Sequence, residues 1–155
     1  MTGENRRDNA NEELSRAEMC LNEARALHAA AFPYGAVSRA YYAVFHASRA
    51  LLFSIGLETK SHKAVVSMIG DHFVRSGRLS PQMGRLLSRL QRDREDADYA
   101  TGAVFTAEEA GKVLAESRSL CRRGPPVNRH GKADRATVIS HGARASASRP
   151  VRRRA

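Results

Sequence analysis

Aromatic residues are scarce in this chain of 155 residues, which has four Tyr, five Phe and no Trp. Long runs of β-branched residues are also rare, and no stretch of useful length alternates between apolar and polar residues as a half-buried strand would. Alanine and leucine are common and recur at helical spacing. The length suffices for one domain with a real core. We therefore predict an all-α fold, a bundle of about five helices, without internal repeats.

Cysteine is nearly absent. Cys20 and Cys121 form no CxxC motif, and neither has a histidine at the sequence spacing of a metal site. Two isolated thiols on predicted helices are best interpreted as small buried apolar residues in a reducing compartment. A disulfide framework and a cysteine metal site are thus not expected.

A long uninterrupted hydrophobic run is missing as well. No apolar stretch near the N-terminus resembles a signal peptide. The longest apolar segment contains Arg39, His46 and Arg49, so it is not a membrane span. We expect a cytoplasmic protein that makes no membrane contact.

Motifs for several enzyme classes are absent too. The sequence has no P-loop, no glycine-rich dinucleotide turn and no HExxH helix. His62 and His72 lack a third ligand at metal spacing, and no serine is marked as a triad nucleophile. We predict no metal and no cofactor, and we place His62 near the start of a helix, facing inward.

Positive charge is what the chain has in excess, and most of it lies in one segment. Of the formal net charge of +10, the 32 residues from Gly124 onward hold eight Lys and Arg against the single acid Asp134. This segment begins with "GPP", lacks aromatic residues and ends in "RPVRRRA". It cannot bury enough apolar surface to fold, so we predict a disordered basic tail over residues 124–155. Such a tail is either a solvated extension without a role or a non-specific contact for polyanions.

The remaining residues, 8–123, are predicted to form the helical bundle. We place the first helix at about Asn11 to Ala31. Local signals mark the other boundaries: a break at Pro33, a glycine end at Gly56, N-caps at Ser61 and Ser80, and a capping box of Thr106 with Glu109.

The stretch "SRAYYAVFHASRALL", residues 38–52, has two different faces when placed on a helix. One face is mostly apolar and suits the core. The opposite face mixes aromatic residues with arginines, a composition typical of interfaces. We predict that this stripe packs either against another helix of the bundle or against a second subunit, and we expect it at a dimer interface. Its members are Arg39, Tyr42, His46, Arg49 and Phe53.

Arg94 lies on the face of the fourth predicted helix that periodicity assigns to the core. An inward guanidinium without a counter-ion is costly, so a carboxylate should meet it, and Asp98 is one turn away. The group Arg94, Asp98 and Tyr99 is therefore predicted to be either a structural ion pair or a site for a phosphate or a partner.

These features resemble a known family. "SRAYYAVFHASRALL", "SHKAVVSMIGDHFVRSGRLSP" and "RLQRDREDADY" occur in this order and are similar to the small stand-alone bacterial and archaeal branch of the HEPN domains. The abbreviation stands for higher eukaryotes and prokaryotes nucleotide-binding. The resemblance covers roughly residues 10–122 and implies a bundle of about five helices, usually dimeric. It also implies a minimal nucleotidyltransferase as partner, in an arrangement similar to toxin–antitoxin modules.

Many HEPN proteins are metal-independent ribonucleases with an Arg followed, a few residues later, by His, commonly with a polar residue after the Arg. In the later helix where this motif normally lies, Arg94 is followed by Tyr99 at the position expected for His, so the match fails. Arg39 and His46 have the required spacing, but Ala40 follows the arginine and the pair lies in the second helix.

The sequence thus leads to two functions. We expect a non-catalytic HEPN-type binding protein, the partner of a minimal nucleotidyltransferase, with a nucleotide or RNA as a further candidate ligand. The alternative is a metal-independent ribonuclease toxin in which Arg39 and His46 act across a dimer interface, the histidine as proton acceptor and the arginine as the cation for the phosphorane. A dimeric adaptor without a nucleic-acid role is a third class.

Overall fold

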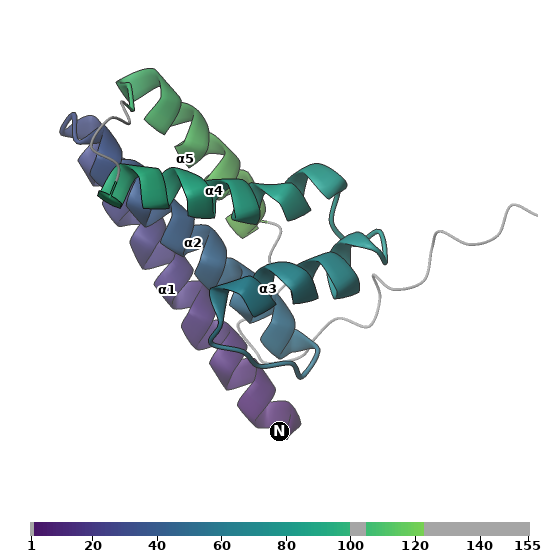
Figure 1. Ribbon diagram of the computed structural model, residues 1–155. Helices are drawn as coiled ribbons and strands as arrows, with labels where there is room; N and C mark the ends of the chain where they lie inside the picture. Colours follow the sequence, from purple (N-terminus) through teal and green to yellow (C-terminus); the bar gives the residue numbers. More distant parts are fainter. Residues whose placement is uncertain (1, 100–104, 123–155) are drawn as a thin grey trace, which may run out of the picture. The chain divides into compact units, whose positions relative to one another are not determined.

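The computed structural model describes residues 2–99 and 105–122, and in these residues the chain is helical without strands. Figure 1 shows the arrangement. The helices are α1 (Gly3–Ala29), α2 (Pro33–Ser54), α3 (His62–Ile69), α4 (Pro81–Tyr99) and α5 (Ala107–Arg122), and α3 continues into a short π-helical turn, Gly70–Val74. The predicted all-α fold with five helices is confirmed for this part of the chain. The predicted tail, residues 124–155, lies outside the described residues.

Helix α1 is longer at its N-terminus than the sequence pattern predicted. It begins at Gly3 and not near Asn11, and Thr2 is its N-cap, accepting a hydrogen bond from the backbone N of Asn5. The first two turns are almost entirely polar and carry no apolar period, so periodicity could not detect them. An N-cap and the burial of Ala10 hold this segment in the helix.

The C-terminal end of α1 is a Schellman motif. The backbone N of Phe32 donates to the carbonyl of Leu27 at 2.8 Å, and the N of Ala31 donates to His28 at 3.1 Å. This motif requires a left-handed residue after the cap, and Ala31 adopts φ of 62° there. An alanine therefore occupies a position that glycine normally fills.

The other predicted helix boundaries are confirmed. Pro33 is the first residue of α2, and Gly56 follows its end with φ of 83°. Ser61 caps α3, and the hydroxyl of Ser80 accepts from Met83 N at the start of α4. The capping box at the start of α5 forms reciprocally, since Thr106 N donates to Glu109 and Glu109 N donates to Thr106 Oγ1.

Helix α2 is the centre of the bundle and packs against α1, α3, α4 and α5. Helices α1 and α2 run antiparallel as long neighbours, and α4 crosses α2 (Figure 1). Most of α2 is buried, including Val37, Tyr41 and Leu52, each at most 1% exposed. The α2 side chains therefore have neighbours on almost every side.

Both cysteines are free and lie in the small apolar cluster with Leu21 and Ala43. Cys20 is buried and Cys121 is half-buried, and the Cys121 thiol donates to the carbonyl of Ala43 at 3.7 Å. The predicted packing role of the thiols is confirmed. Among the helices of the described part of the chain, none combines the length and apolar character of a membrane span.

Candidate functional site

A buried carboxylate joins α1 to the polar residues of α2. Oε2 of Glu13 accepts a hydrogen bond from Nδ1 of His46 at 2.7 Å, and its Oε1 pairs with Nη1 of Arg49 at 2.8 Å. The side chains of Glu13, His46 and Arg49 are only 7%, 16% and 15% exposed. A buried carboxylate needs polar partners in place of water, and here His46 and Arg49 of α2 supply them.

Sequence reasoning missed Glu13, although a signal was present. Glu13 lies at helical spacing between Ala10 and Ala17, which are both buried. Like Arg94, Glu13 is a charged residue at a position that helical periodicity assigns to the core. Such an acid indicates a cation on the facing helix.

The Glu13 contacts change the interpretation of the α2 stripe. Phe53 is only 4% exposed within the single chain, and the guanidinium of Arg49 lies 5.5 Å from its ring centroid and 5.9 Å from that of Phe45. Intramolecular packing therefore covers Phe53, His46 and Arg49 within the single chain, and a dimer interface at or beside the stripe stays a prediction.

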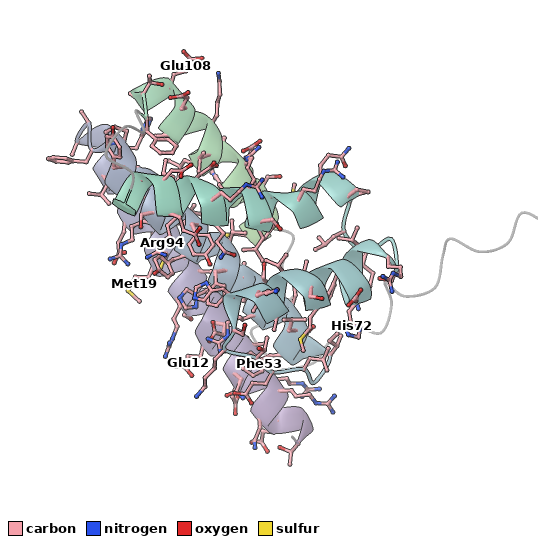
Figure 2. The ribbon with its side chains drawn as sticks, viewed as in Figure 1. Glu12, Met19, Phe53, His72, Arg94 and Glu108 are labelled. Atoms are coloured by element: carbon pink, nitrogen blue, oxygen red, sulfur yellow. The ribbon has the colours of Figure 1, made fainter. Side chains whose placement is uncertain are left out.

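The other end of the stripe is more open. Arg39 pairs with Glu23 of α1 at 3.3 Å, and both side chains are nearly half exposed. The half-buried ring of Tyr42 has the guanidinium of Arg39 at 5.9 Å and that of Arg94 at 5.6 Å from its centroid. Met19 and Glu12 project outward from α1 (Figure 2). Tyr42 thus lies between two arginines from different helices.

Arg39 and His46 do not form a joint pair in the single chain. Each is engaged by a different α1 carboxylate, Glu23 for Arg39 and Glu13 for His46. The spacing that suggested a catalytic pair therefore reflects two separate α1–α2 ion pairs.

The fold brings a second histidine to this region. His62, the first residue of α3, stacks on Phe45 with a centroid distance of 4.2 Å and an interplanar angle of 11°. The hydroxyl of Tyr41 forms a hydrogen bond with Nδ1 of His62. The ring of His46 meets the same Phe45 ring edge-on at 5.6 Å, so both imidazoles border one aromatic ring. His62 faces inward at the start of its helix, as predicted.

The electrostatic environment of His62 is positive. Burial lowers the pKa of His62, and the charges of Arg94, Arg49 and His46 lower it further, against the opposing charge of Glu95. Burial also raises the pKa of Tyr41 to about 12. The hydroxyl of Tyr41 therefore stays protonated and His62 is stabilised in its neutral form.

A carboxylate can only accept, so Nδ1 of His46 donates its hydrogen to Glu13. Nδ1 of His62 shares a hydrogen bond with the hydroxyl of Tyr41. Each imidazole is thus held by a side chain from another helix. We call the residues that meet here the α2 cluster: Glu13, Tyr41, Tyr42, Phe45, His46, Arg49, His62 and Arg94.

Arg94 contacts Tyr42 of α2 and influences His62, which fits its predicted inward position. The side chains of Asp98 and Tyr99, predicted to accompany it, lie outside the described residues. In the part of the chain that the structure describes, no group of three His, Cys, Asp or Glu side chains is arranged to hold a metal ion.

Comparison with known proteins places the chain in a family. The model of the HEPN domain matches residues 10–123. The chain is 36% identical over 107 residues to "Putative toxin MJ0605" of Methanocaldococcus jannaschii, covering 69% of this chain and 79% of that protein. It is also 36% identical over 101 residues to the UPF0332 protein glr0978 of Gloeobacter violaceus, covering 65% and 80% of the two chains.

A further relative, "Putative toxin MJ0142" of Methanocaldococcus jannaschii, is 29% identical over 101 residues, which are 65% of this chain and 69% of that one. The resemblance seen in the three sequence motifs is confirmed, and the matched region contains the whole α2 cluster. The chain belongs to the HEPN domain family.

Proposed function

We propose that this chain is the binding component of a toxin–antitoxin-like module and that its α2 cluster binds a phosphate group of a nucleotide or RNA. The observation that carries the proposal is that Arg94 of α4 lies over the ring of Tyr42 while His62 of α3 stacks on Phe45, one turn further along α2. Guanidinium and imidazole N–H groups are the usual donors to phosphate, and an aromatic ring suits a base.

The surroundings favour an anion at this place. His62 is the first residue of α3, where the helix dipole and free backbone N–H groups add positive potential. Arg49 pairs with Glu13, and the half-buried guanidinium of Arg94 contacts the ring of Tyr42.

Two features of the family and the sequence extend the proposal. Two relatives are named toxins, and the minimal nucleotidyltransferase expected from the resemblance is the proposed protein partner. The eight basic residues of the 124–155 segment would add non-specific attraction for a polyanion. Such attraction depends strongly on salt and reads no sequence, unlike the α2 cluster.

The test is nucleotide binding measured by fluorescence with mant-ATP at physiological salt. Arg94→Met keeps the apolar volume but removes the donors, and we expect it to weaken binding by about tenfold or more, since a charge-assisted hydrogen bond contributes about 1.5–3 kcal/mol. Arg75→Met is the matched control, because Arg75 is 80% exposed and pairs only with its neighbour Asp71 among the described residues. Equal binding by the two variants would contradict the proposal.

A second candidate function is metal-independent RNA cleavage, and one observation favours it. The Glu13–His46 hydrogen bond orients the imidazole through Nδ1, an arrangement that many acid–base enzymes use. His62 and Arg94, and not Arg39, then supply the nearby donors. RNA cleavage in the presence of a chelator, lost in His46→Ala and retained in Arg39→Ala, would replace the binding function with this one.

A further inference from the structure

A groove separates α4 from α5 on a part of the bundle that the α2 cluster does not use. Its volume is about 790 Å³, and its lining is mainly apolar. Met83, Leu86 and Ala115 supply apolar lining, while Arg85, Arg89 and Arg92 contribute guanidinium groups. None of these residues belongs to the α2 cluster, so the groove is a separate feature.

The dimensions suit a short helix. The lining residues of α4 extend from Gln82 to Arg92, which corresponds to about 15 Å at a rise of about 1.5 Å per residue. Helix α5 contributes small residues, Ala115 and Ser119, which leave space beside α4. Two to three turns of a helix would fill such a groove.

The charge of the groove is positive, with three arginines against Glu116. Arg89 is engaged by Glu116 and by Asp93, the latter at 3.7 Å. Within residues 2–99 and 105–122, no ion pair engages Arg85 or Arg92.

The same positive character continues along α5. A neighbouring hollow of about 450 Å³ shares Ala115 and Ser119 with the groove and adds Arg118 and Arg122. These two arginines also have no ion pair in the described part of the chain.

The chemistry distinguishes between occupants. Single-stranded nucleic acid needs aromatic rings for its bases, and no aromatic residue lines the groove. A second copy of this chain would also bring exposed acids of α1, so self-association is one outcome of the test below. An apolar floor bordered by free arginines matches apolar side chains flanked by carboxylates.

We propose that the α4–α5 groove binds an acidic amphipathic helix of a partner protein. Apolar side chains one turn apart on that helix would contact Met83, Leu86 and Ala115, and carboxylates on its two flanks would pair with Arg85 and Arg92. The proposal does not depend on phosphate binding at the α2 cluster, because the two sites share no residue.

The experiment uses the full chain and a synthetic helical peptide labelled with fluorescein. The peptide carries leucines one turn apart on one face and glutamates on both flanks, and its counterpart replaces every glutamate with lysine. Fluorescence anisotropy should show saturable binding of the acidic peptide only. The double variant Arg85→Glu with Arg92→Glu should weaken it at least tenfold, while Arg7→Glu, which alters an exposed arginine of α1, should not.

A steric variant keeps the test independent of total charge. Ala115→Trp fills the groove at an exposed helical position and should also abolish binding, with the helical circular dichroism unchanged. Equal binding of the acidic and lysine peptides, or of the parent and Ala115→Trp, would overturn the proposal. Two other results would also overturn the proposal. One is binding of a short oligouridine RNA, and not of the acidic peptide, that Ala115→Trp weakens. The other is self-association of the parent chain that Ala115→Trp abolishes.

Discussion

Removing the carboxylate of Glu13 should be the most damaging single change on the α1–α2 interface. Glu13→Ala deletes a hydrogen bond of 2.7 Å to His46 and an ion pair of 2.8 Å with Arg49. A hydrogen bond to a charged group contributes about 1.5–3 kcal/mol, and breaking a buried ion pair typically costs about 3–5 kcal/mol. The side chain of Arg49 keeps 15% exposure and two aromatic neighbours, which relieve part of this cost, so we expect a loss of about 3 kcal/mol in the free energy of unfolding.

The assay is urea denaturation followed by circular dichroism, with thermal melting as a second readout. A loss of about 3 kcal/mol corresponds to roughly 10–15 °C in Tm for a domain of this size. Glu12→Ala is the matched control, because this neighbouring acid is 61% exposed and pairs only with Arg16 among the described residues. The control should change stability by less than about 0.5 kcal/mol.

Glu13→Gln should lie between the two, because the amide keeps the volume and one acceptor but loses the charge. A Glu13→Ala variant within about 1 kcal/mol of the parent would refute the reasoning, since it would mean that His46 and Arg49 lose little when their shared carboxylate is removed. A double-mutant cycle of Glu13→Ala with Arg49→Met would measure the coupling directly.

Three further predictions concern local features. Ala31→Gly should raise the free energy of unfolding by about 0.5–1 kcal/mol, measured by urea denaturation, because glycine adopts φ of 62° without strain; an unchanged or lowered value would contradict this. The thiols of Cys20 and Cys121 should react slowly with a thiol reagent at pH 8 until the chain unfolds, because burial raises the pKa of both, that of Cys121 to about 12; rapid reaction of the native protein would be the contrary result. Folding lowers the pKa of His62 from its ordinary value of 6.5. As the pH falls, His62 is therefore protonated in the unfolded chain before it is protonated in the folded chain. The free energy of unfolding should thus decrease below about pH 6.5. His62→Phe should show a shallower decrease between about pH 7 and pH 5 than the parent, and equally steep profiles would exclude this histidine as the cause.

The sequence by itself determined the helices and their ends, because those depend on residues close together in the chain. Ser61, Ser80 and the Thr106–Glu109 pair cap their helices through hydrogen bonds over three residues. Pro33 and Gly56 act through their own backbone angles. Such signals need no knowledge of the tertiary structure, and the N-terminal turns of α1 escaped prediction because they carry no apolar period.

Only the tertiary structure decided what the polar residues of α2 contact. Glu13 reaches His46 across 33 residues, and His62 reaches Tyr41 across 21. A helical wheel gives the direction of a side chain but not the helix that faces it, so Phe53 and Arg49 could be assigned equally to a subunit interface or to internal packing. The packing of α1 against α2 covers these residues within the single chain, because the Glu13 carboxylate contacts both His46 and Arg49.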